Sequence, residues 1–152
     1  YRVEGFNAPV YRLERLLHDA SEAYNGDLIR PLKYDDEFRE PFSKVEALNE
    51  RAIASRFNLP YPMLPHHKIA DEAVTACEVE QLITMRPDMT WDGKLHDDSV
   101  VANFLIRCEH YEATETRFLR LFELLMTHRY WNAPESYWAS DEYQRILENA
   151  VA

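Results

Sequence analysis

Glycine is scarce in this sequence. Only three glycines occur among the 152 residues. Dinucleotide-binding and P-loop folds need glycines at fixed positions beside a phosphate, and sheet-rich folds need them in tight turns. The chain is therefore not expected to be a Rossmann-type or P-loop protein, or to contain an extensive sheet.

Cysteine and long apolar runs are also rare. The two cysteines, Cys77 and Cys108, lie in patterns typical of helices, and we expect both to be buried, reduced thiols. No run approaches the roughly 18 apolar residues of a membrane-spanning helix, and we expect no signal peptide. These absences predict a cytoplasmic protein without a membrane partner.

Positive charge is outnumbered, with 17 Lys and Arg against 27 Asp and Glu and a net charge of −10. An acidic surface repels nucleic-acid phosphates, so we expect no nucleic-acid partner. The candidate for a basic patch is a stretch with helical spacing, but Glu115 and Glu123 reduce its net positive charge. Its basic residues are Arg117, Arg120, His128 and Arg129.

Apolar residues recur at helical spacing along the chain, and alternating strand patterns are absent. The spacing predicts helices over residues 10–24, 38–57, 67–85, 100–127 and 140–149. The loop over 27–33 follows an Asn-Gly pair, and the loop over 58–65 contains three prolines. We expect one all-α domain over residues 1–152, with the apolar stripe of the helix over 100–127 in its core.

The stretch HDASEAYNGDLIRPLK, residues 18–33, gathers groups that suit metal chemistry. On a helix, Glu22 is four residues from His18 and three from Asp19, so the three side chains share one side. Imidazole and carboxylate bind transition metals, and Glu22 is placed to accept a proton or orient a water. The alternative is a helix end at which His18 pairs locally while the acids face water.

The same stretch closely resembles the signature of the HD-domain phosphohydrolases, in the branch of the 5′-deoxynucleotidases and phage deoxynucleoside triphosphohydrolases. The matching positions are His18-Asp19, Ala20-Ser21-Glu22, Gly26-Asp27, Pro31 and Lys33. ALNERAIASRFNLPYPMLPHHKIADEAVTACEVEQL, residues 47–82, is similar to the second half of that domain, with its Ala-Asp at Ala70-Asp71. The resemblance covers residues 11–85 and implies a helical HD-domain bundle.

The resemblance implies a role for each matching residue. The metal ligands are His18, Asp19 and Asp71, the catalytic residues are Glu22 and Asp27, and the substrate phosphate binds Arg30 and Lys33. The alternative for the two cations is a solvated loop. His67 is a further ligand candidate if its helix starts early enough to place it one turn before Asp71; otherwise His66 and His67 form a surface pair.

The implied cofactor is one divalent transition metal, manganese, cobalt or zinc, with magnesium as a companion of the substrate phosphates. The implied substrate is a deoxynucleotide. The motif does not separate monophosphate from triphosphate hydrolysis, although FNLPYPMLP is more similar to the phage triphosphohydrolases. The resemblance also implies a homo-oligomer.

One feature of the family is missing. Its members carry another metal-ligand histidine on an earlier helix, whereas none of the 17 residues before His18 is a histidine. Because the chain starts at Tyr1, we expect the helix with this histidine to lie outside it. The alternatives are a substitute ligand or a degenerate domain that binds a nucleotide or a partner without hydrolysis. A purely acidic interaction protein is the third hypothesis.

Overall fold

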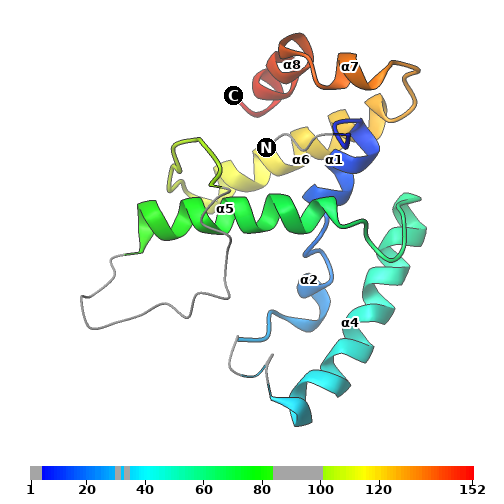
Figure 1. The fold of residues 1–152 in the computed structure, drawn as a ribbon, viewed down its shortest axis with the longest axis vertical. Coiled ribbons are helices and arrows are strands. Elements are labelled where there is room, and N and C mark those ends of the chain that lie inside the picture. Colours follow the sequence, from blue (N-terminus) through cyan, green and yellow to red (C-terminus); the bar gives the residue numbers. More distant parts are fainter. Residues whose placement is uncertain (1–4, 30–31, 33–34, 84–100) are drawn as a thin grey trace. The chain divides into compact units, whose positions relative to one another are not determined.

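The computed structural model describes residues 5–29, 32, 35–83 and 101–152. Within these ranges the chain forms helices and no strand, which confirms the all-α prediction (Figure 1). The helices are α1 (Pro9–Leu16), α2 (Glu22–Asn25), α4 (Asp36–Phe57), α5 (His66–Leu82), α6 (Tyr111–His128), α7 (Glu135–Trp138) and α8 (Asp141–Val151). No helix in the described ranges is long and apolar enough to cross a membrane.

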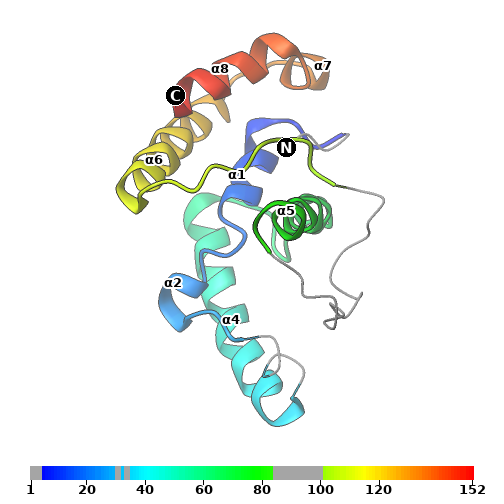
Figure 2. The same cartoon turned by 90° about the vertical axis from the view of Figure 1, so that its left-hand side faces the viewer.

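The chain divides into two compact units. One comprises Glu14–Leu64, and the other comprises Tyr1–Leu13 together with Pro65–Ala152, so that the boundary falls within α1. The first unit holds α2 and α4, and the second holds α5 to α8 (Figures 1 and 2). The predicted single domain stays a prediction.

In the Glu14–Leu64 unit, α2 packs against the long helix α4 (Figure 2). Asp35 caps α4 by accepting a hydrogen bond from the amide of Glu37 at 2.9 Å. The side-chain amide of Asn49 donates from Nδ2 to Oδ1 of Asn25 at 3.1 Å, and this hydrogen bond joins the two helices. Asn58 ends α4 in the left-handed conformation, which asparagine tolerates well.

The predicted continuous helix over 10–24 is wrong. It stops at Leu16, and consecutive turns lead to the short α2. The amides of Leu17, Ala20 and Glu22 each bond the carbonyl three residues earlier, in place of the four-residue step of an α-helix. His18 and Asp19 therefore lie in a turn between two helices.

In the second unit, residues 101–110 form no helix, although the spacing predicts a helix over 100–127. The amide of Ala102 donates to the carbonyl of Ala73 on α5 at 2.9 Å. The Gln81 side chain forms two hydrogen bonds with the same segment. It donates to the carbonyl of Phe104 at 2.8 Å and accepts from the backbone amide of Ile106 at 2.9 Å. A small apolar core forms there, built from Ala73, Cys77 and Ala102 with Val74, Val101 and Ile106 around it.

An aromatic core joins α6, α7 and α8 of the same unit. His128 stacks on Trp131, with ring centroids 3.8 Å apart, and Tyr143 packs edge-on against Trp138 at 4.7 Å. Buried Arg12 of α1 lies over the Tyr143 ring at 5.7 Å and donates to the carbonyls of Asn7 at 2.8 Å and Trp138 at 3.2 Å. The start of the chain is thereby tied to its last helices.

The fourth predicted helix is also less buried than expected. Among its predicted core residues, Leu125 is buried, whereas five apolar side chains are exposed: Phe104, Leu105, Tyr111, Phe118 and Leu119. Cys77 is a buried free thiol as predicted, but Cys108 is exposed. Phe104, Leu105 and Cys108 lie outside any helix, because α6 starts only at Tyr111.

Candidate metal centre

His18 is oriented by the backbone of the helix before it. Its Nδ1 lies 2.9 Å from the carbonyl oxygen of Arg15, in the last turn of α1. A carbonyl oxygen only accepts hydrogen bonds, so Nδ1 carries the proton. The ring is thereby held in the form whose Nε2 is available as a donor atom to a metal.

Nε2 of His18 lies 2.9 Å from Oδ2 of Asp19. When the ring is protonated on both nitrogens, this contact is a charge-assisted hydrogen bond. When the ring is neutral, two electron-pair donors face each other, an arrangement that a cation between them would stabilise. Both states are consistent with a half-exposed pair at the surface of a turn.

The two predicted catalytic acids follow closely in the chain. Glu22 is the first residue of α2, and its amide donates to the carbonyl of Asp19 at 2.9 Å. Asp27 is exposed and follows Gly26, whose φ of 72° ends α2 in a conformation that favours glycine. Glu22 and Asp27 thus follow Asp19 by three and eight residues in the chain.

Asp71, the third predicted ligand, lies on α5 of the other unit. Its Oδ2 pairs with Nζ of Lys68 at 2.8 Å, one turn earlier on the same helix. A metal at this carboxylate would have to compete with the ammonium group. The structure describes the two parts of the predicted ligand set separately, because His18 and Asp19 belong to the Glu14–Leu64 unit.

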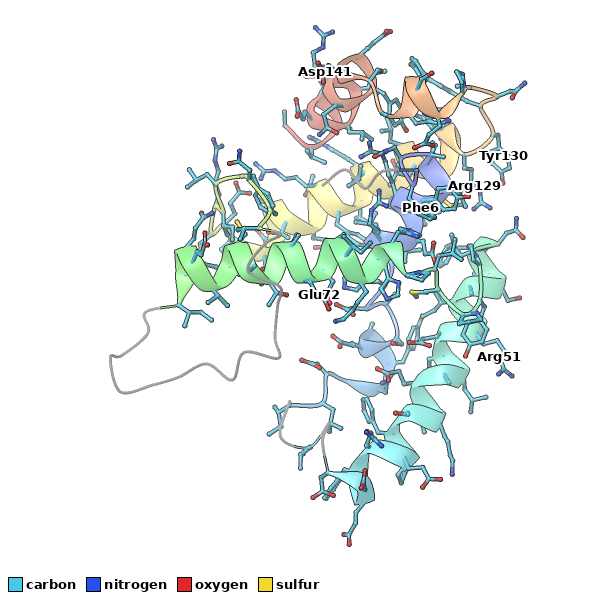
Figure 3. All side chains as sticks on the ribbon, viewed as in Figure 1. Phe6, Arg51, Glu72, Arg129, Tyr130 and Asp141 are labelled. Carbon is cyan, nitrogen blue, oxygen red and sulfur yellow. The ribbon has the colours of Figure 1, made fainter. Side chains whose placement is uncertain are left out.

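The neighbouring histidines have different environments. His67 and Asp71 both lie in α5 at a spacing of one turn, as the ligand alternative requires. His66 is buried, so the predicted surface pair is wrong for this member. Its ring stacks on Phe6, which lies beside α1 (Figure 3), at 4.6 Å, and Tyr11 packs edge-on against the ring at 5.4 Å. His66 is thus a packing residue.

Arg30 and Lys33, the predicted phosphate-binding residues, lie outside the described residues. Across the ranges that are described, no group of three or more His, Cys, Asp or Glu side chains is arranged to hold a metal ion. The His18–Asp19 pair is thus a two-donor arrangement within its own unit.

Glu14 is a buried acid that the sequence analysis missed. Its side chain is fully buried, and Oε1 accepts a hydrogen bond from the amide of Leu64 at 2.7 Å. The contact ties Leu64, near the end of the proline-rich segment, to α1. Its position among the leucines of RLERLL was the available signal, because an acid inside an apolar stripe needs a partner.

Comparison with known proteins identified no relative. No family model, curated protein or solved structure matches the chain at a significant level.

Proposed function

We propose that this chain is a metal-dependent phosphohydrolase acting on deoxynucleotides. The observation that carries the proposal is the geometry of the HD pair. Nδ1 of His18 is anchored to the Arg15 carbonyl, and Nε2 lies 2.9 Å from the Asp19 carboxylate. A histidine ligand that donates its second N–H to a backbone carbonyl is the usual arrangement in metal sites.

His18 and Asp19 would hold the ion, with Asp71 as the carboxylate from α5. A bound divalent ion supplies positive charge at the phosphoryl group and acidifies the attacking water. Glu22 takes the proton of that water, and Asp27 assists in passing it on. Arg30 and Lys33 offset the remaining charge of the phosphates. The substrate class rests on the resemblance of residues 11–85, and triphosphates are the favoured substrates.

Metal content and phosphate release test the proposal together. Purified protein loaded with manganese or cobalt is assayed against a panel of deoxynucleoside mono- and triphosphates. We expect His18→Ala and Asp19→Ala to lose the metal and the activity, and Glu22→Gln to keep the metal while losing at least about 100-fold in rate. Activity that survives Glu22→Gln would remove this residue from the mechanism.

Matched controls separate the site from general surface effects. His110→Ala removes an exposed histidine that pairs with a nearby acid at 3.7 Å, as His18 does, but outside the motif. Asp36→Ala removes an exposed acid of α4. Both variants are expected to keep metal content and rate unchanged.

A second candidate is a degenerate HD domain that binds a nucleotide or a partner without hydrolysis. The Lys68–Asp71 pair favours it, because an ammonium group at 2.8 Å occupies the position of a cation at the third predicted ligand. Nucleotide binding with no phosphate release under any metal would support this candidate and refute the hydrolase.

A further inference from the structure

A groove lies between α6 and α8 in the second unit. The two helices pack against each other, and the groove has a volume of about 460 Å³, within the range of small-molecule binding sites. Tyr143, near the start of α8, contacts His128 at the end of α6, with ring centroids 5.7 Å apart, and the two helices run antiparallel (Figures 1 and 2). Asn149 and Ala150, in the last turn of α8, form one wall of the groove.

One side of α6 forms the other wall. Arg120, Leu124 and His128 follow one another at intervals of four residues, so they share this side of the helix, and Glu123 borders it. Arg120 and Glu123 are three residues apart, a spacing that often pairs opposite charges on a helix. Within the described residues, however, neither side chain has an ion-pair or hydrogen-bond partner. Both charges can therefore bind a ligand.

The position of the His128 proton follows from its contact with Tyr143. Tyr143 is fully buried, so its hydroxyl proton needs an acceptor. Among the described residues this hydroxyl has one partner, Nδ1 of His128 at 3.2 Å, so Nδ1 accepts the hydrogen bond. A neutral imidazole that accepts at Nδ1 carries its own proton on Nε2. Burial lowers the pKa of His128 below its ordinary value of 6.5, which keeps the ring neutral near pH 7.

The Nε2–H group of His128 is a donor that opens onto the groove. His128 is only 6% exposed, and it lines the groove. Within the part of the chain that the structure describes, Nε2 has no hydrogen-bond partner, yet it is not one of the enclosed polar atoms. A ligand in the groove can supply the acceptor that this nearly buried donor lacks.

We propose that the groove binds a free amino acid with a neutral carbonyl group in its side chain, of which glutamine is the type. Arg120 and His128 lie about 12 Å apart along the helix, so they suit two acceptors at opposite ends of one ligand, and the long arginine side chain covers part of that distance. The α-carboxylate binds the Arg120 guanidinium, and the neighbouring ammonium group pairs with Glu123. The side-chain carbonyl accepts from Nε2–H of His128, and the methylene groups lie on Leu124. The inference does not depend on the phosphohydrolase proposal.

The charges of the groove favour a zwitterion over other small ligands. Arg120 and Glu123 together carry no net charge and the His128 ring is neutral, so a ligand with one charge of each sign is matched. A phosphate or a dicarboxylate would bring a second negative charge beside Glu123. A simple amine would leave Arg120 without a partner.

The fluorescence of Trp131 measures binding, because its ring stacks on His128 at 3.8 Å. We expect L-glutamine to change this fluorescence saturably, with a dissociation constant of about 0.01–1 mM. Three analogues each lack one group: glutaramate lacks the ammonium group, γ-aminobutyramide lacks the carboxylate, and norvaline lacks the side-chain amide. Each analogue should bind at least about 10-fold more weakly than L-glutamine.

Substitutions then pair each side chain with the group that it binds. Arg120→Gln should weaken L-glutamine binding at least about 10-fold but leave the affinity for γ-aminobutyramide unchanged. Glu123→Gln should weaken L-glutamine binding about fivefold or more but leave the affinity for glutaramate unchanged. Both side chains are exposed, so the fold is kept. The matched controls are Arg145→Gln on α8 and Glu115→Gln on α6, at exposed positions outside the groove, and they should not change the affinity.

Each of four results would overturn the inference. The first is the absence of a saturable response to L-glutamine up to about 10 mM. The second is equal affinity for L-glutamine and glutaramate, which would mean that Glu123 binds no ammonium group. The third is an affinity that survives Arg120→Gln, which would place the ligand elsewhere. The fourth is a proton on Nδ1 of His128, detected by NMR of the imidazole nitrogens, which would remove the donor from the groove.

Discussion

His18 receives its orientation from the carbonyl of Arg15, in the last turn of a helix that ends one residue later. The broken helix therefore has a chemical consequence. In a continuous helix this carbonyl would bond a later amide, whereas here the imidazole takes its place. The histidine and the adjacent aspartate meet because the backbone turns between them.

Lys68 competes with any cation at Asp71, since its ammonium group lies 2.8 Å from the carboxylate. If Asp71 is a metal ligand, Lys68→Ala should tighten manganese binding by about threefold to tenfold, because one competing charge is removed. Isothermal titration calorimetry measures the change.

The control for this prediction is Lys44→Ala, which breaks an exposed pair of equal length between Lys44 and Glu40. It should leave manganese affinity unchanged. Equal affinities for Lys68→Ala and the parent chain would mean that Asp71 does not bind the metal.

His128 makes stability depend on pH. Burial lowers the pKa of His128 below its ordinary value of 6.5, and Nδ1 lies 3.2 Å from the Tyr143 hydroxyl. Burial also raises the pKa of Tyr143 to about 12, so this hydroxyl keeps its proton and can donate it to the neutral ring. Below pH 6.5 the unfolded chain binds a proton that the folded chain resists, so stability should fall as the pH falls further.

Denaturant unfolding followed by the fluorescence of Trp131 and Trp138 measures this dependence, because both rings pack near His128. His128→Gln should reduce the loss of unfolding free energy on acidification, whereas His110→Gln, at an exposed site, should not. An unchanged pH slope in His128→Gln would assign the acid sensitivity to other groups.

At the scale of elements, α5 holds the non-helical segment that begins at residue 101 through one backbone and two side-chain hydrogen bonds. The side-chain amide of Gln81 donates to the Phe104 carbonyl and accepts from the Ile106 amide. The small side chains Ala73 and Ala102 allow the close backbone approach that their 2.9 Å hydrogen bond requires. Three backbone groups of the segment thus have partners on α5.

Gln81→Ala should therefore loosen this segment and cost about 1–2 kcal/mol, since two partly exposed hydrogen bonds are lost. The buried Cys77 thiol lies beneath the segment and should react faster with a thiol reagent in this variant. The measurement uses a Cys108→Ser background, because Cys108 is exposed.

The matched control is Gln144→Ala, in which the lost hydrogen bond joins Gln144 to Glu148 on the exposed side of α8. Cys77 reactivity should stay at the parent level there. If Gln81→Ala also leaves it unchanged, backbone contacts and apolar packing alone hold the segment.

At the scale of the whole molecule, contacts between residues far apart in the chain define the unit that contains both ends. The Asn7 amide donates to Glu135 Oε1 at 2.8 Å, and Arg12 donates to the Trp138 carbonyl at 3.2 Å. These contacts span 128 and 126 residues of sequence. They join the two segments of this unit, which precede and follow residues 14–64 in the chain.

Arg12→Leu should destabilise this unit by about 2–4 kcal/mol, because two buried carbonyls lose a charged donor. Arg12→Lys should recover less than half of the loss, since an ammonium group cannot reproduce the forked geometry. Fluorescence-detected unfolding distinguishes the two variants. An exposed arginine of α8 provides the control, Arg145→Leu, which should cost little.

The local features of this molecule were readable from the sequence. Helical spacing of apolar residues predicted α4, α5 and α8 to within three residues at each end, because caps, prolines and amphipathic spacing act over a few neighbours. The contact between the His18 and Asp19 side chains also requires no distant partner, because residues adjacent in the chain can meet wherever the backbone turns.

Only the tertiary structure decided what depends on distant partners. Residues 101–110 do not form the predicted helix, because α5 offers the Ala73 carbonyl and the Gln81 side chain, and packing outweighs propensity. Burial of Glu14, His66 and Arg12 likewise depends on segments 50 or more residues away. For Glu14 the surrounding leucines signal burial, but the identity of each distant partner has no local signature.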